Sequence, residues 1–220
     1  LKVGMPMDAS RLNEERTRLA EYLSSKGYYG FTKDYITYVA DTARNSSTVG
    51  VSMRIRSRQV VRGEDGTRHV VPYTPYRIGN LTYMMYPVSY NYQRDFAFTD
   101  TLRRDGASYY FNSELLLRPQ VLGHASMFVP GALYDGGKVK ESHASFGRLA
   151  ALKYTNILFT ETSDSTLDCN VVLYPAKKIS TSAELDLTNT SGDFGVSAAL
   201  SFTDRNLFRG AEVFTLKLRG

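Results

Sequence analysis

The residues best suited to chemistry lie around Asp135, Ser142 and His143, which are the residue types of an acid, a nucleophile and a base. His143 falls in an expected helix, and no tight strand-to-helix turn is present there to expose a serine nucleophile. Gly136-Gly137-Lys138 lacks the upstream glycine spacing of a phosphate-binding loop. The sequence therefore predicts no catalytic residue here, and His143 is expected to be a surface or partly buried histidine.

The sequence contains no better set of residues for metal, redox or cofactor chemistry. Cys169 is the one cysteine, so neither an internal disulfide nor a cysteine zinc site can form. The histidines are scattered without the spacing of metal ligands: His69, His124 and His143. Three carboxylates flank an expected hairpin turn and are interpreted as solvated: Glu161, Asp164 and Asp168. We expect a protein that is not an enzyme and that binds no metal and no cofactor.

The charge balance is only mildly basic. The 27 Lys and Arg against 22 Asp and Glu give +5 at pH 7, which does not require a nucleic-acid partner and is compatible with an anionic membrane surface. The tyrosines alternate like strand residues and mark no exposed platform for stacking bases. No run of about eighteen apolar residues predicts a membrane-spanning helix. No signal peptide is recognisable, and the chain is interpreted as a piece of a longer protein.

The clearest pattern lies between Lys177 and Gly220, where three segments alternate apolar and polar residues. This is the period of a strand with one apolar and one polar face. Ser191-Gly192-Asp193 suits a tight hairpin, and the polar Asp204–Gly210 connection also ends in glycine. The apolar positions are Leu185, Leu187, Phe194, Val196, Leu200, Phe202, Phe214, Leu216 and Leu218. Such segments are typical of a transmembrane β-barrel wall, but a soluble antiparallel sheet has the same alternation.

Upstream of these segments, the first part of the chain reads as a helix followed by two strands. Asp8 is a suitable N-cap and Gly27 a suitable stop for the helix. Strands are expected at 31–39 and 49–55, with a polar loop between them. Residues 58–76 then read as a hairpin or linker turning at Asp65-Gly66.

A second set of elements begins at Arg77. A strand is expected at 78–87 and an insertion rich in Tyr, Phe and Asp at 88–112, with a turn at Asp105-Gly106. Two helices are expected around 115–123 and 138–154. Two further strands are expected at 156–162 and 167–174. The order is strand, helix, helix, strand, strand.

Glu184 to Gly192, followed by Arg205 to Glu212, resembles the start of the barrel in the BamA/TamA-like outer-membrane assembly family, especially its surface-antigen members from Bacteroidetes-type bacteria. Pro130 to Tyr134 and Asn156 to Phe159 resemble the last POTRA domain of that family. Gly27-Tyr28-Tyr29 is similar to the segment that closes a helix in another POTRA domain of that family. The resemblance implies an α+β fold in which tandem POTRA modules (β-α-α-β-β) precede the first antiparallel strands of an outer-membrane β-barrel.

The implied domains are 1–76, the C-terminal part of a POTRA domain plus a linker; 77–176, a complete POTRA domain with the insertion 88–112; and 177–220, the first three barrel strands. The resemblance implies the outer membrane of a Gram-negative bacterium, with the POTRA part in the periplasm. Implied partners are unfolded outer-membrane proteins, accessory periplasmic or lipoprotein subunits and the membrane itself. No nucleic acid is expected.

The implied function is a scaffold for outer-membrane protein assembly and insertion that binds client strands by β-augmentation. The strand at 178–190 would border a lateral gate and pair with the client, through residues that include Ser182, Glu184, Asp186 and Thr188. The nine apolar positions would face lipid. Two alternatives stay open: a soluble periplasmic protein-binding module, and a two-partner secretion transporter that exports one cognate substrate.

These assignments carry geometric expectations. The segments 36–39 and 51–55 should be antiparallel neighbours, and the two strand-helix sets should superpose as one fold. The turn Asp204–Gly210 should lie at the same end of its strands as the preceding POTRA domain, with Phe208 packed against the Pro130–Tyr134 loop or its neighbours. The chain is also expected to self-associate through residues 178–220.

Overall fold

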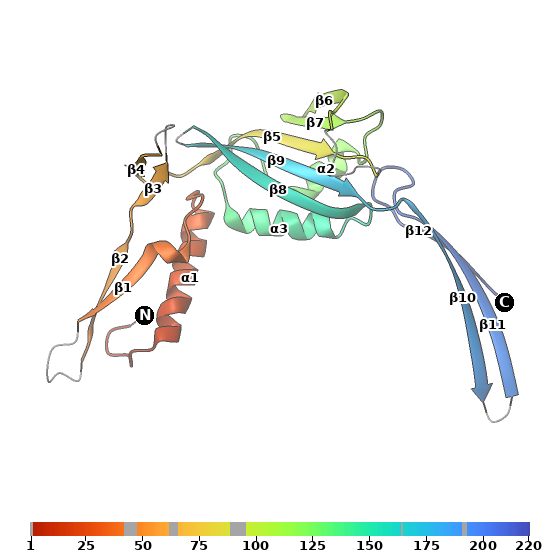
Figure 1. The fold of residues 1–220 in the computed structure, drawn as a ribbon, viewed down its shortest axis with the longest axis horizontal. Coiled ribbons are helices and arrows are strands. Elements are labelled where there is room, and N and C mark those ends of the chain that lie inside the picture. Colours follow the sequence, from red (N-terminus) through yellow and green to blue (C-terminus); the bar gives the residue numbers. More distant parts are fainter. Residues whose placement is uncertain (1, 42–47, 62–65, 89–95, 164, 191–192) are drawn as a thin grey trace. The chain divides into compact units, whose positions relative to one another are not determined.

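The computed structural model describes residues 2–41, 48–61, 66–88, 96–163, 165–190 and 193–220 (Figure 1). The expected polar loop after Asp41, the turn residue Asp65, part of the insertion, Asp164 and Ser191-Gly192 fall mainly outside these ranges. The chain divides into two compact units. One comprises Leu1–Ile78, Gly131–Lys138 and Glu161–Leu167, and the other Gly79–Pro130, Val139–Thr160 and Asp168–Gly220. No helix among the described residues has the length and apolar character to cross a membrane.

The first unit begins with helix α1 (Ala9–Ser25). The Asp8 side chain accepts a hydrogen bond from Ser10 N–H at 2.8 Å, as expected of an N-cap. The helix ends at Ser25 with Lys26 as its C-cap, and Gly27 follows at φ 95°, a left-handed conformation that favours glycine. Both ends of α1 are therefore where the sequence predicts them.

After α1 the chain forms a 3₁₀ turn, η1 (Lys33–Tyr35), and an antiparallel pair, β1 (Ile36–Asp41) and β2 (Gly50–Ile55). Ile36 lies opposite Ile55 and Val39 opposite Ser52, which confirms the expected pairing of these segments. The strand predicted from Phe31 is wrong at its start. Phe31 instead packs in a core with Ala20 and Ile36.

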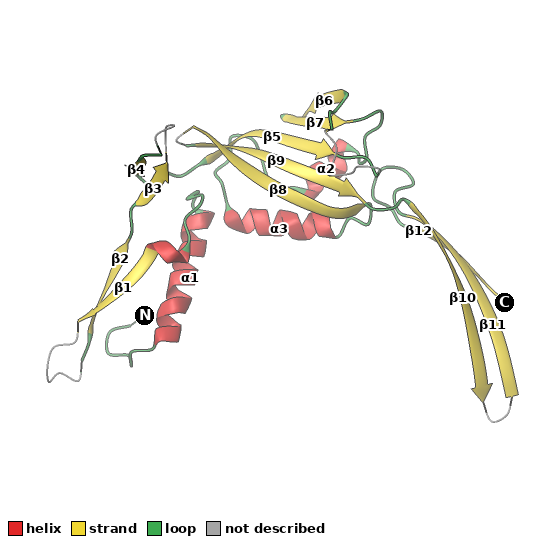
Figure 2. Cartoon of the chain, in the orientation of Figure 1, coloured by secondary structure: helices red, strands yellow, loops and turns green. Residues whose placement is uncertain are grey.

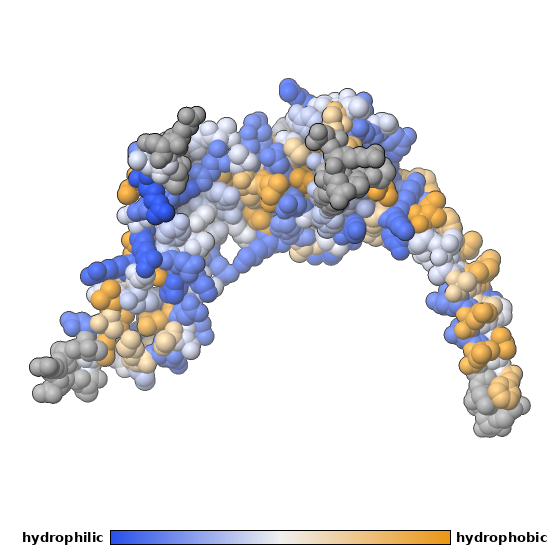
Figure 3. Space-filling model, in the orientation of Figure 1, coloured by the Kyte–Doolittle hydropathy of each residue, from blue (hydrophilic) through white to orange (hydrophobic). Residues whose placement is uncertain are grey.

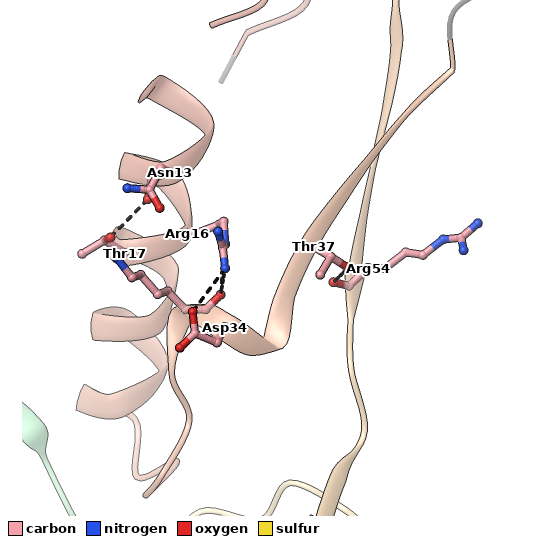
Figure 4. Close-up of polar contacts among 7 residues, drawn as sticks. Asn13, Arg16, Thr17, Asp34, Thr37 and Arg54 are labelled. Atoms are coloured by element: carbon pink, nitrogen blue, oxygen red, sulfur yellow. Dashed lines mark hydrogen bonds and ion pairs between the residues drawn. The ribbon is translucent and has the colours of Figure 1, made fainter. Parts of the chain in front are cut away.

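Arg16 is the physical reason for the late start of β1. Its guanidinium donates to the carbonyl oxygen of Lys33 at 3.0 and 2.9 Å and lies 3.5 Å from an oxygen of Asp34 (Figure 4). These contacts hold the first residues of the expected strand against α1 in a turn. A two-stranded hairpin, β3 (Arg58–Val61) with β4 (Arg68–Val71), follows and confirms the hairpin expected at 58–76.

Most of the second unit is a sheet and two helices (Figure 2). In the described part of the chain the strand order is β6-β7-β5-β9-β8. The bounds are β5 Arg77–Met85, β6 Asp100–Arg104, β7 Ala107–Phe111, α2 Pro119–Ala125, α3 Gly136–Gly147, β8 Leu152–Ser163 and β9 Thr166–Pro175. The helix predicted at 138–154 therefore ends early, and Tyr154 belongs to a strand. Fully buried side chains of this unit form its core: Leu117, Leu122, Phe146, Cys169, Val171 and Leu173.

The insertion has a structural role that the sequence did not reveal. Its second part folds into the hairpin β6–β7, turning at Asp105 and Gly106 with positive φ values of 53° and 77°. Strand β7 then pairs with β5 in parallel, with Tyr83 opposite Tyr109. The insertion thereby extends one side of the sheet by two strands and leaves β8 as the edge on the other side.

Three long strands follow: β10 (Ile179–Thr190), β11 (Asp193–Asp204) and β12 (Phe214–Arg219). They form an antiparallel sheet of order β10-β11-β12, whose strands agree closely with the three predicted segments.

Candidate functional site

The register of the three-stranded sheet places the nine predicted apolar side chains on one face. Leu187 lies opposite Val196, and Leu200 opposite Leu218; opposite residues in a ladder point to the same side of the sheet. The nine side chains are exposed by 37% at Phe202 to 83% at Phe194. Apolar residues gather along the β10–β11 arm in Figure 3. The face is therefore continuous and open, and its contact with lipid stays a prediction.

The opposite face is polar and internally bonded. The hydroxyl oxygens of Ser182 and Ser201 lie 2.6 Å apart. Lys217 Nζ lies 3.1 Å from Glu184 Oε2, and an Arg219 nitrogen lies 3.8 Å from Asp186 Oδ2. These pairs join β12 to β10 across β11, which is possible because the intervening β11 residues, such as the buried Ala199, are small. The side chain of Thr188 lies outside the described part of the structure.

The phase of the β10–β11 ladder decides which backbone groups of β10 face outward. Arg205 N–H donates to Lys178 O at 2.9 Å, and the register makes these two residues an opposite pair. Bonded pairs alternate along an antiparallel ladder, so even-numbered residues of β10 bond to β11. Odd-numbered residues, such as Ala183, direct their N–H and C=O away from β11. Among the described residues no strand lies on that side of β10.

This pairing pattern changes which residues of β10 could bind a client strand through their backbone. Ser182, Glu184 and Asp186 carry the polar side chains, but the backbone groups open to a partner belong to the residues between them. Alternation in a single strand shows which side chains share a face. Only the pairing with β11 shows which amides remain outside it.

The connection from β11 to β12 is anchored to the loop before α2. Asn206 Nδ2 donates to Leu116 O at 2.7 Å, and Arg118 N–H donates to Arg209 O at 2.9 Å. Arg209 also pairs with Glu114 at 2.7 Å. These contacts confirm that the Asp204–Gly210 turn lies at the end of the strands next to the preceding α+β sheet.

The turn is also bonded within itself. Asn206 Oδ1 accepts from Ala211 N–H at 3.1 Å, and Asp204 Oδ1 accepts from Asn206 N–H at 3.0 Å. Hydrogen bonds from the backbone N–H groups of Glu212 itself, Gly210 and Phe208 hold the pKa of the Glu212 carboxyl below its usual value. The predicted packing of Phe208 against 130–134 is wrong: Phe208 is 70% exposed, since the turn docks on 114–118 through its polar atoms.

The groups first considered for catalysis have structural roles. Ser142 is buried and its hydroxyl oxygen accepts from Met127 N–H at 2.9 Å, whereas His143 is exposed. Asp135 accepts from Gly137 N–H at 2.8 Å at the start of α3. No cluster of metal-ligating side chains occurs within the described ranges.

Glu161 is exposed, as its interpretation as a solvated carboxylate implies, whereas Asp168 is half-buried, and both carboxylates also make contacts across the sequence. Glu161 forms an ion pair with Arg58 and accepts from the Tyr76 hydroxyl at 2.9 Å, which ties β8 to β3. Asp168 accepts from the backbone N–H of Asn80 at 2.9 Å and so bridges β9 and β5. Contacts this distant in sequence leave no local signal.

Cys169 is expected to be unreactive in the folded chain. The thiol is fully buried, and burial raises its pKa to about 12. Because the thiolate is the nucleophile, labelling at pH 8 should proceed only through unfolding. An aromatic disulfide reagent should react at least about a hundredfold more slowly than with the chain in denaturant. Fast native labelling would contradict the burial of this side chain.

The elements define first a class of fold: an α+β sheet of strand-helix-helix-strand-strand order, with the β6–β7 hairpin inserted after its first strand, that leads directly into long antiparallel strands. One solved structure that matches is the crystal structure of BamA from Haemophilus ducreyi lacking POTRA domains 1–3, with a TM-score of 0.60 at 9% identity. The alignment covers 100% of this chain and 32% of that one. The likeness establishes the fold, and it confirms at that level the resemblance to BamA/TamA-like proteins. The chain spans about a third of the length of that BamA structure.

Two other solved structures match at lower TM-scores, which support no assignment. BamA POTRA3-5 of Haemophilus influenzae has 0.42 at 9% identity, covering 79% of this chain and 51% of that chain. CdiB from Acinetobacter baumannii has a TM-score of 0.44 at 9% identity, and the alignment covers 100% of this chain and 36% of that chain. No protein-family model matches the sequence, and no curated protein matches it significantly.

Proposed function

We propose that this chain is the periplasmic arm and the first barrel strands of an outer-membrane protein assembly or insertion machine. Residues 1–76 and 77–176 would be POTRA modules, the first of them partial, and residues 177–220 the start of the barrel. The protein would bind unfolded outer-membrane proteins and accessory periplasmic or lipoprotein subunits. It would act by binding and templating, without enzymatic chemistry, a cofactor or nucleic acid.

The observation that carries this proposal is the exposed apolar face of β10–β12. Nine side chains such as Leu185 and Phe194 lie open on one face while the other face is bonded within the sheet. A soluble binding module would cover such a face with its own chain, because each buried aliphatic or aromatic side chain contributes about 1.5–3 kcal/mol. A lipid environment removes the same surface from water, which favours the membrane alternative.

The open edge of β10 supplies the binding chemistry. The outward N–H and C=O groups of its odd-numbered residues can pair with an extended client strand without reading its side chains. Such pairing suits many different clients. The energy would come from burying the client in the growing sheet and in the bilayer, so no nucleotide is needed.

The edge of β8 offers a second place for an extended partner. It runs twelve residues, from Leu152 to Ser163, and no described strand pairs with its outer side, while the β6–β7 hairpin extends the opposite side of the sheet. Its outer residues are mostly exposed. We propose that an accessory subunit or a client segment pairs here while β10 engages the client strand at the membrane.

Proline at position 183 tests the β10 edge. Ala183→Pro removes an outward N–H and leaves the bonds from β10 to β11 in place, since an edge position tolerates proline. Loss of one hydrogen bond of about 1–1.5 kcal/mol should slow client assembly about tenfold. The matched control is Ala183→Thr, which keeps the N–H and should assemble clients normally.

The measurement is folding of several outer-membrane proteins in cells that depend on the variant, followed by protease resistance of each client. Unchanged assembly in Ala183→Pro would rule out pairing at this edge. Loss confined to one secreted protein would instead favour the two-partner secretion alternative.

A further inference from the structure

A stripe of aromatic rings crosses one face of the five-stranded sheet. Tyr83 and Leu173 point to the other face, toward the helices; the Tyr83 hydroxyl bonds to Ser126 just after α2. Side chains alternate along each strand, so the stripe lies on the face away from the helices. Its members are Tyr86, Phe96, Phe98, Tyr110, Tyr154 and Tyr174.

Ring contacts make the stripe continuous across the strands. Tyr154 of β8 stacks on Tyr174 of β9 at 4.2 Å between centroids, and Tyr174 stacks on Tyr86 at 5.1 Å. Tyr86 contacts Phe98 at 5.1 Å, and Phe98 contacts Tyr110 of β7 at 6.1 Å. The rings are only partly buried, and Tyr154 is 40% exposed.

The same face is polar at its other end. There Asn80 Nδ2 donates to the Asp168 carboxylate at 3.1 Å, and Thr160 of β8 is exposed. Tyr154 and Thr160 share a face of one strand and lie about 20 Å apart at 3.3 Å per residue. Leu158, next to Thr160 on this face, is 48% exposed, so the surface changes from aromatic to polar along the strand direction with one aliphatic side chain near its polar end.

The aromatic end is the end from which β10 leaves. Tyr174 precedes Lys178 by four residues, and the backbone N–H of Ala176 donates to Ala151 O at 2.9 Å. That bond places Lys177 and Lys178 beside the start of β8, and both lysines are exposed; Lys178 also lines a hollow together with Tyr86. Two lysines, Lys177 and Lys178, therefore follow the aromatic end at the start of the proposed barrel strand.

We propose that this aromatic end is a membrane-docking surface that lies in the phospholipid headgroup layer. The inference rests on the proposed function, because β10 would enter the bilayer beside it. Tyrosine has an apolar ring and a polar tip and is enriched at membrane interfaces. Lysines there can bind lipid phosphates. The polar end around Asn80 and Thr160 stays in water.

Single tryptophans test this placement, because the chain contains none. Tyr154→Trp reports on the aromatic end, and Thr160→Trp is its matched control on the same strand face. Leu200→Trp reports on the apolar face of β10–β12. Each full chain is added to phosphatidylethanolamine–phosphatidylglycerol vesicles containing lipid brominated near the headgroup, with circular dichroism to establish folding.

The brominated lipid should quench about half of the fluorescence of the Tyr154→Trp chain and leave that of the Thr160→Trp chain unchanged. This is expected if only the aromatic end reaches the interface. Quenching at 200 but not at 154 would overturn this inference and leave the proposed function standing. Absence of quenching at both 154 and 200 would overturn both. Quenching at 154 alone would support the docking surface and remove the lipid role of the β10–β12 face. Equal quenching at 154 and 160 would refute an oriented surface.

Discussion

Serine at four apolar positions of β10 and β11 is expected to turn a self-associating chain into a monomer. The changes are Leu185→Ser, Leu187→Ser, Val196→Ser and Leu200→Ser, all on the open face. Each apolar side chain buried between two copies contributes about 1.5–3 kcal/mol. Their combined loss should weaken association by about three orders of magnitude or more, since 1.4 kcal/mol is tenfold in the dissociation constant.

Sedimentation velocity over a range of concentrations without detergent measures the effect. A chain ending at Pro175, which lacks the three strands and their open edges, should also be monomeric. The matched control is Ser182→Ala with Ser201→Ala on the polar face, which keeps the apolar surface and should still associate. A wild-type chain that stays monomeric at high concentration would favour the soluble-module alternative.

Asn206→Ala is expected to release the three-stranded sheet from the loop before α2. Asn206 is buried and joins Leu116 O to Ala211 N–H, so its removal leaves two backbone groups without their partner. A buried unsatisfied group costs about 1–3 kcal/mol, and because these two groups are only partly buried we expect the lower part of the combined range, a loss of about 2–4 kcal/mol in the free energy of unfolding.

Hydrogen exchange separates this local release from general destabilisation. The N–H groups of Ala211 and Arg118, which are bonded at the anchor, should exchange much faster in Asn206→Ala, whereas those of the central strand β9 should be less affected. The control is Asn156→Ala at an exposed position of β8, expected to change stability by less than about 0.5 kcal/mol. Unchanged protection at Ala211 would contradict the anchoring role.

Local rules explain what the sequence predicted well. Capping by Asp8 and the left-handed Gly27 set both ends of α1, because the unpaired groups of a helix end are satisfied by immediate neighbours. The alternation within 178–220 predicted both the strands and their shared apolar face, because side-chain direction in a strand has a period of two.

Longer-range contacts decided the rest. Arg16 delays β1 by binding the Lys33 carbonyl, and the insertion pairs β7 with β5 in parallel, a choice that no local pattern encodes. The sequence alone is enough to predict that β10 has an apolar face. Which of its amides remain open to a partner, and where the Asn206 turn docks, depend on pairing with residues far along the chain. Only the tertiary structure determines those, because hydrogen bonds between distant segments select one register and one docking site from many that the local sequence allows.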